Sequence, residues 1–133
     1  MTTRKITPPE LQNYYDNWHM SPGIACGDFL FLTGMTGVRN DETISTNPEE
    51  QIRDAFKKIE SILGEAGGNF SHVIEMTTYH VGLREHIDLF RSIRDEFVVE
   101  PYPAWTAIEV SGFITDGAIV EIRVVAHLPL KVR

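Results

Sequence analysis

Residues 101–127 read PYPAWTAIEVSGFITDGAIVEIRVVAH and contain two runs rich in β-branched and aromatic side chains, separated by a polar turn. This composition predicts β-strands over Ala104–Val110 and Ala118–His127. Successive side chains of a strand point to opposite faces of the sheet. One face of the second strand carries four apolar residues: Val120, Ile122, Val124 and Ala126. The other carries two apolar and two charged residues: Ile119, Glu121, Arg123 and Val125. Both faces of this strand therefore present apolar groups.

Upstream, residues 47–68 (NPEEQIRDAFKKIESILGEAGG) predict an amphipathic helix. Asn47 is a favourable N-cap, Pro48 suits the first helical position, and Glu50 completes a spacing typical of a capping box. Apolar residues then recur at helical spacing and form one side of the helix. The other side is charged, and Lys58 is expected to lie on it. The pair Gly67-Gly68 is expected to end the helix.

The rest of the chain predicts an α+β domain. A second helix is expected over Glu85–Phe97, and further strands over Asp28–Thr33 and Val73–Val81, with one more near Ile6 or Ile24. The polar segment 37–46 predicts a loop. The order β, α, β, α, β, β fits a single domain over residues 1–133, since 42% hydrophobic and 23% charged residues are typical of one globular core.

Two helices can cover only one face of such a sheet, and the chain offers no third helix for the other. The second apolar face then needs a partner, and self-association is the simplest answer. The alternative is a half-solvated face with scattered apolar residues.

Charge and cysteine content exclude several function classes. The formal net charge is −7, and the basic residues are dispersed among acidic ones, so nucleic acid is not expected as a partner. No run approaches the ~20 apolar residues of a membrane span, and the N-terminus lacks the apolar stretch of a signal peptide, so neither membrane nor secretion is expected. A single cysteine, Cys26, fits a reducing compartment, and we expect a cytoplasmic protein.

The sequence offers few signals for metal or cofactor chemistry. The five histidines have no metal-ligand spacing, and each is expected at the surface or in a turn. Cys26 has no base nearby in sequence and is expected to be a small core-like residue. Gly34 and Gly37 follow a strand, but they lack the Lys-Ser/Thr pair that follows the glycines of a phosphate-binding loop. Backbone N–H groups at these glycines could still hold a carboxylate or carbonyl oxygen. Neither a metal nor a cofactor is therefore expected.

Glu121 is the strongest polar candidate, because its neighbours along the strand are mostly apolar. A carboxylate in this setting is either paired, with Arg123 or with a neighbouring subunit, or is an acid/base group with a raised pKa. The sequence alone leaves both interpretations open.

Four segments together resemble the RidA (YjgF) family: SPGIACGDFLFLTGMTG, the helix ending in ILGEAGG, HVIEMTTYHV, and the C-terminal stretch quoted above. The C-terminal match is specific, with Pro103-Ala104-Trp105-Thr106 followed by the strands around Glu109 and Glu121. The resemblance implies a chorismate-mutase-like α+β fold and a homotrimer with small-molecule pockets at the subunit interfaces. It also implies hydrolysis of reactive enamines and imines, such as 2-aminoacrylate, to keto acids and ammonia without a cofactor or metal.

The resemblance assigns roles to individual positions. The water-handling glutamate of the family falls on Glu121, its strand-end Ser/Thr-Gly on Thr33 and Gly34, and a backbone contact on Ala107. The arginine that grips the substrate carboxylate falls on Trp105. Indole offers one donor and a large apolar surface, so it cannot replace the bidentate guanidinium. The family's usual glutamine falls on Met35 and a common pocket tyrosine near Met20, which predicts a more apolar pocket.

Three functions follow as hypotheses. The first is a hydrolytic deaminase acting on an imine or enamine other than the usual one, with Glu121 positioning water and backbone groups at Gly34 and Ala107 polarising the substrate. The second is a non-catalytic, small-molecule-binding trimer. The third is ribonuclease activity or translation inhibition, which some relatives are said to have, and which the acidic balance disfavours.

Overall fold

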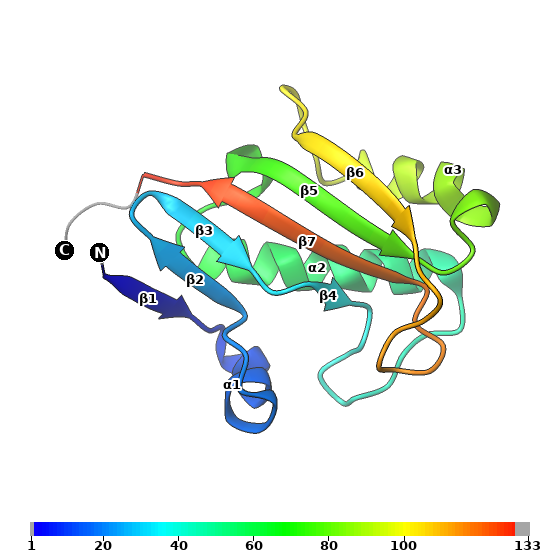
Figure 1. Ribbon diagram of the computed structural model, residues 1–133, viewed down its shortest axis with the longest axis horizontal. Helices are drawn as coiled ribbons and strands as arrows, with labels where there is room; N and C mark the ends of the chain where they lie inside the picture. The colour runs from blue at the N-terminus through cyan, green and yellow to red at the C-terminus, as the bar shows by residue number, and fades with distance from the viewer. Residues whose placement is uncertain (1, 130–133) are drawn as a thin grey trace.

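The computed structural model describes residues 2–129 and contains one mixed sheet with helices on one side (Figure 1). The strands are β1 (Thr3–Ile6), β2 (Gly23–Cys26), β3 (Phe29–Leu32), β4 (Met35–Thr36), β5 (Val73–His80), β6 (Ala104–Glu109) and β7 (Val120–His127). The helices are α1 (Gln12–Trp18), α2 (Pro48–Glu65) and α3 (Leu83–Arg94), and two 3-10 turns, η1 (Pro9–Leu11) and η2 (Phe70–His72), precede α1 and β5.

The sheet order is β1-β2-β3-β7-β5-β6, and β4 pairs separately with β7. The β5–β6 pair is parallel and is connected through α3, while the other pairs are antiparallel. The four predicted strands are confirmed, and strands are present near both Ile6 and Ile24. The predicted α+β class is confirmed as well.

Helix α2 begins and ends where the sequence predicts. The Asn47 side chain accepts a hydrogen bond from the backbone N–H of Glu50 at 3.2 Å, and Pro48 is the first helical residue. Gly67 takes a positive φ of 86° directly after the helix, a conformation that glycine adopts at little cost. The other predicted helix is shifted, because it starts at Leu83 and ends at Arg94 instead of covering 85–97.

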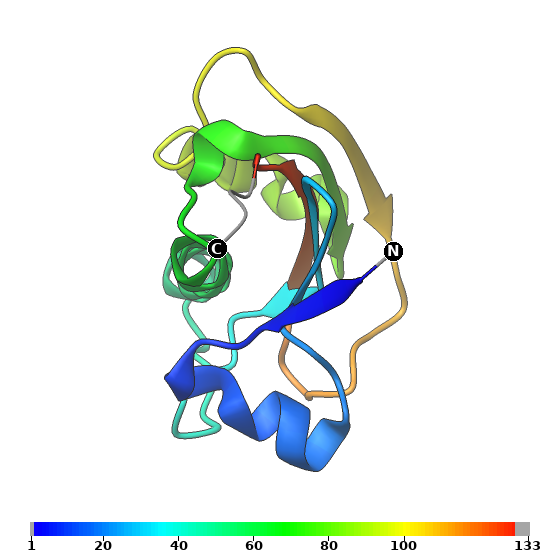
Figure 2. The same cartoon turned by 90° about the vertical axis from the view of Figure 1, so that its left-hand side faces the viewer.

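The core lies between the sheet and α2, which packs on β4, β7 and α3. Its centre is aromatic: Phe56 stacks on Phe97 at 4.9 Å between ring centroids and contacts Phe90 at 5.5 Å. Figure 2 shows the curved sheet with α2 on its concave side. On the opposite side the large apolar residues Phe29, Phe31 and Ile108 are each about two-fifths exposed, and no helix of residues 2–129 covers them.

Helix α1 was not predicted from the sequence. It has no buried residue and no side-chain N-cap, so it lacks both the apolar stripe and the start signal that identify helices. It lies below the sheet, at the same end as the loop after β4 and the loop before β7 (Figure 1). These three segments enclose the cavity described next.

Candidate functional site

A cavity of about 210 Å³ lies at this end of the sheet. Its wall combines aromatic and apolar residues with carboxylates, and includes Tyr14, Trp18, Met20, Gly34, Phe113 and Glu121. Helix α1, the start of β4, the β6–β7 loop and β7 therefore each contribute to it. Residues far apart in the sequence meet here because β4 pairs with β7, which sets Thr36 opposite Glu121.

The carboxylate of Glu121 lies directly on the backbone of Gly34. A Cβ atom at position 34 would be 2.6 Å from Oε2 and 2.8 Å from Cδ of Glu121, which is closer than real side-chain contacts allow. An alanine at this position would therefore push the Glu121 carboxylate away, because the nearest atoms belong to that flexible side chain. The sequence analysis singled out both residues, and the structure brings them together.

Burial raises the pKa of Glu121 above its ordinary value, and the nearby positive charge of Lys58 partly opposes this rise. In the part of the chain that the structure describes, the carboxylate forms no ion pair, with Arg123 or with any other cation. Within one chain the acid/base interpretation therefore fits better than pairing with Arg123, and pairing across a subunit interface stays a prediction.

Lys58 is buried behind the cavity, with 8% of its surface exposed. Its Nζ donates to the Tyr14 hydroxyl oxygen at 2.5 Å and to the Val38 carbonyl oxygen at 3.0 Å. The expectation that Lys58 lies on the exposed charged side of its helix is wrong, because the loop after β4 folds over that part of α2.

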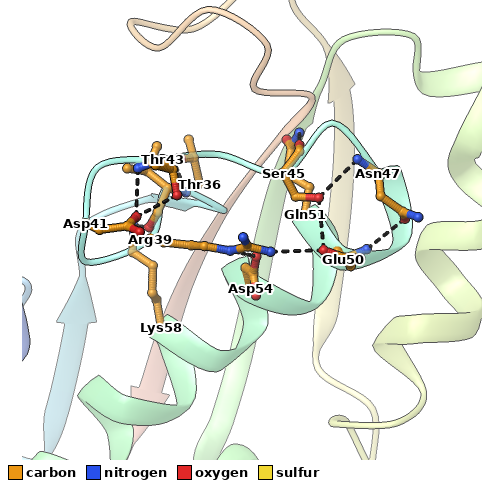
Figure 3. A network of polar contacts seen from close by, with 11 residues as sticks. Thr36, Arg39, Asp41, Thr43, Ser45, Asn47, Glu50, Gln51, Asp54 and Lys58 are labelled. Atoms are coloured by element: carbon orange, nitrogen blue, oxygen red, sulfur yellow. Dashed lines mark hydrogen bonds and ion pairs between the residues drawn. The ribbon is translucent and has the colours of Figure 1, made fainter.

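A polar network holds this loop on α2, and Figure 3 shows Lys58 extending from the helix toward it. Arg39 binds Asp54 at 2.9 Å and Glu50 at 3.0 Å. The buried side chain of Gln51 donates to the carbonyl oxygens of Ser45 and Gly117 and accepts from the backbone N–H of Ile119. The loop and the start of β7 are thus tied to the same helix.

Trp105 lies on the helix side of the sheet, away from the face that carries Glu121. Its indole Nε1 donates to the Thr78 hydroxyl at 2.9 Å, and its ring stacks on Phe90 with 5.8 Å between centroids. The guanidinium of Arg94 covers the same ring at 4.6 Å. Trp105 and Ala107 are not among the residues lining the cavity of a single chain.

Thr33 has a structural partner inside the chain. Its hydroxyl donates to the Ser21 carbonyl oxygen at 2.7 Å, and its backbone N–H donates to Pro22. These bonds fix the backbone immediately before Gly34. Of the two methionine positions singled out by the resemblance, Met20 lines the cavity, whereas Met35 is fully buried in the core.

The model of the endoribonuclease L-PSP family matches residues 14–128 of the chain. The RutC family protein YjgH of Escherichia coli is 31% identical over 125 residues, which cover 93% of this chain and 94% of that protein. The chain belongs to the RidA (YjgF) family. The RutC family protein y4sK of Sinorhizobium fredii is 32% identical over 110 residues, covering 81% of this chain and 86% of that protein.

Solved structures confirm the chorismate-mutase-like fold expected of a RidA-family chain. The structure of protein YjgH superimposes with a TM-score of 0.88 at 30% identity and covers 98% of this chain and 100% of that one. RidA from an Antarctic Psychrobacter species has a TM-score of 0.77 at 22% identity, covering 82% and 88% of the two chains. The latter supports the fold alone.

Sequence reasoning missed Tyr14 and Lys58. Tyr14 sits on the helix that carries no start signal, and Lys58 resembles any other charged residue of an amphipathic helix. The expectation that each histidine lies at the surface or in a turn is wrong for His80, which is fully buried and contacts Thr78 at 2.7 Å.

Among residues 2–129, no cluster of three histidine, cysteine or carboxylate side chains is arranged to bind a metal ion. No helix in that range is long and apolar enough to cross a membrane.

Proposed function

We propose that the chain is a hydrolytic deaminase that acts on a reactive imine or enamine without a carboxylate group. The observation that carries this proposal is the half-buried Glu121 carboxylate, which forms no ion pair within residues 2–129 and is held against Gly34 in the wall of an aromatic cavity. A desolvated carboxylate that is not neutralised by a partner is suited to accept a proton.

The reaction needs one base and a means of polarising the substrate. Glu121 accepts a proton from water as the oxygen attacks the imine carbon, and then passes this proton to the nitrogen. Glu121 next carries the hydroxyl proton of the adduct to the nitrogen, so the C–N bond breaks, ammonia leaves and a carbonyl group remains. Backbone groups at Gly34, and at Ala107 of a neighbouring copy, hold the polar atoms of the substrate.

The cavity favours a substrate without negative charge. Two carboxylates, Glu42 and Glu121, line it together with Tyr14, Trp18 and Phe113, and none of the described lining residues is lysine or arginine. The carboxylate of a 2-imino acid would meet Glu42 and Glu121, while the Lys58 ammonium behind the wall is already bound to Tyr14 and Val38. A flat apolar imine could instead stack on the aromatic side chains. This agrees with the replacement of the family's carboxylate-binding arginine by Trp105.

The assembly proposed is a homotrimer with the ligand sites at its interfaces. The uncovered face with Phe29, Phe31 and Ile108, and the free edge of β6, support association. In the trimer, β6 of the next copy would bring its backbone at Ala107 to the cavity beside Thr33 and Gly34, together with the edge of a Trp105 ring that stays packed on Phe90 of its own chain. Light scattering should then give three times the chain mass of 15.1 kDa, and a stable monomer would contradict the interface sites.

The test compares two imines that differ only in a carboxylate. Flavin oxidases release the free imine from phenethylamine and from phenylalanine, and the decay of each imine is followed with and without the protein. We expect clear acceleration with the phenethylamine imine and at least about tenfold less with the phenylalanine imine, because a missing charged clamp costs more than ~1.4 kcal/mol.

Two results would contradict this proposal. Equal acceleration of both imines would refute the substrate class. Acceleration of neither, together with binding of an aromatic ketone, would favour the non-catalytic binding trimer instead.

RNA is not proposed as a substrate despite the family's description. The net charge of −7 opposes polyanion binding, and several basic residues, among them Arg39, Arg53 and Lys58, are occupied by partners within the chain. We propose the cytoplasm as the compartment, because a chain with one cysteine does not use an internal disulfide.

A further inference from the structure

Lys58 is a buried cation immediately behind the cavity wall. It extends from α2, and two of its three ammonium hydrogens are directed to the Tyr14 hydroxyl and the Val38 carbonyl. The ammonium also lies 4.9 Å from the centroid of the Tyr14 ring. Burying a lysine costs free energy even when its hydrogen bonds are made, so the buried Lys58 ammonium lowers the free energy of unfolding.

The direction of the Lys58–Tyr14 hydrogen bond follows from chemistry. An ammonium group has only donors, so the Tyr14 oxygen must be the acceptor. The proton of the Tyr14 hydroxyl then needs another acceptor, and no hydrogen bond from it is made within residues 2–129. Tyr14 also lines the cavity that contains Glu121.

We propose that Lys58 and Tyr14 form a donor pair, in which Lys58 positions the Tyr14 hydroxyl to donate a hydrogen bond to an oxygen or nitrogen atom of the ligand, while Glu121 of the same cavity acts as the acceptor. Tyr14 is the residue that touches the ligand, and Lys58 is a positioning residue. The inference rests on the proposed function, since it takes this cavity as the ligand site.

The protonation states agree with this arrangement. Burial lowers the pKa of Lys58 to about 8, with the negative charges of Glu121 and Asp54 acting in the other direction, so the ammonium form still predominates at pH 7. Burial, and then the charge of Glu121, raise the pKa of Tyr14, which keeps its hydroxyl protonated as a donor. The titratable groups around Glu121 come from α1, α2, the loop after β4, β5 and β7, and are Tyr14, Lys58, Glu42, Tyr79 and Arg123. Asp54 of α2 acts on Lys58.

The first experiment needs no turnover. Carboxyl-detected NMR titration of Glu121 is recorded for the wild type, Lys58→Met and Lys58→Arg. Lys58→Met keeps the apolar stem and removes the charge that lowers the pKa of Glu121, so this pKa is expected to rise further. Lys58→Arg keeps the charge and should restore most of the wild-type value, which a purely structural role would not produce. An unchanged titration of Glu121 in Lys58→Met would overturn the proposal.

The second experiment measures the donor itself. Acetophenone, a carboxylate-free aromatic ketone, is titrated into the wild type, Tyr14→Phe, Lys58→Met and the double variant. The loss of one hydrogen bond should weaken binding about fivefold to tenfold in each single variant. The double variant should be no weaker than Tyr14→Phe, because Lys58 acts through Tyr14.

Equal affinity in the wild type and Tyr14→Phe, including no measurable affinity in either, would overturn the proposal, and so would additive losses in the double variant. The proposed deaminase activity fails on a different result, the absence of accelerated imine decay. The two failures are therefore distinguishable.

Discussion

Replacing Gly34 by alanine is expected to disable the site while leaving the fold intact. The new Cβ would lie 2.6 Å from Oε2 of Glu121, and ordinary contact begins at 3.4 Å, so the carboxylate would have to move by about 0.8 Å to regain an ordinary contact. A displacement of roughly 1 Å at a reacting group commonly costs about 100-fold in rate. The atom displaced belongs to a side chain, so the free energy of unfolding should change by less than about 1 kcal/mol.

The assay is the decay of the phenethylamine imine, together with urea unfolding of the same samples. Gly64→Ala is the matched control, because Gly64 lies exposed in α2 and the Cβ that alanine adds there would have no heavy atom within 4 Å. This control should raise stability by about 1 kcal/mol and leave the rate unchanged. A Gly34→Ala variant with the wild-type rate would refute the role assigned to the Glu121–Gly34 contact.

Three further predictions concern the surroundings of the site. Gln51→Met should lower the free energy of unfolding by about 3 kcal/mol in urea titrations, because three backbone groups lose their buried partner. Trp105→Arg should cost about 2 kcal/mol in the same measurement, since it removes the hydrogen bond to Thr78 and sets a second guanidinium beside Arg94; a variant as stable as the wild type would contradict this packing. Burial lowers the pKa of His80 to about 4 from 6.5, so the unfolded chain binds this proton first as the pH falls, and the contribution to stability is complete above pH 6.5. It should decline by up to about 3 kcal/mol between pH 6.5 and 4, and His80→Gln should remove this decline.

The parts of the fold that local signals determine could be predicted from the sequence. Helix α2 carries its own N-cap, apolar stripe and terminal glycines, and the structure starts and ends it at those residues. Helix α3 begins two residues before the predicted start because Glu109, on β6, accepts the N–H groups of Gly82 and Leu83. That cap comes from a residue 26 positions away in sequence, which no local pattern shows.

The candidate site was predictable only where a local sequence pattern marks the residue. Glu121 and Gly34 stand in recognisable strand motifs, whereas Tyr14 and Lys58 gain their roles only when α1 and the loop after β4 fold over α2. Trp105 and Ala107 share one face of β6 because they are two residues apart, but this spacing alone does not say which face the helices cover. In the structure that face is the helix side, so Trp105 packs on Phe90 within the chain.

The decay rate of the phenethylamine imine in the presence of Glu121→Gln tests the central claim most directly. Glutamine keeps the shape of the side chain and cannot accept the proton from water, so the catalysed rate should fall by at least about 100-fold. Glu60→Gln, an exposed change on α2, should retain the wild-type rate. A Glu121→Gln variant as active as the wild type would show that the carboxylate beside Gly34 is not the base.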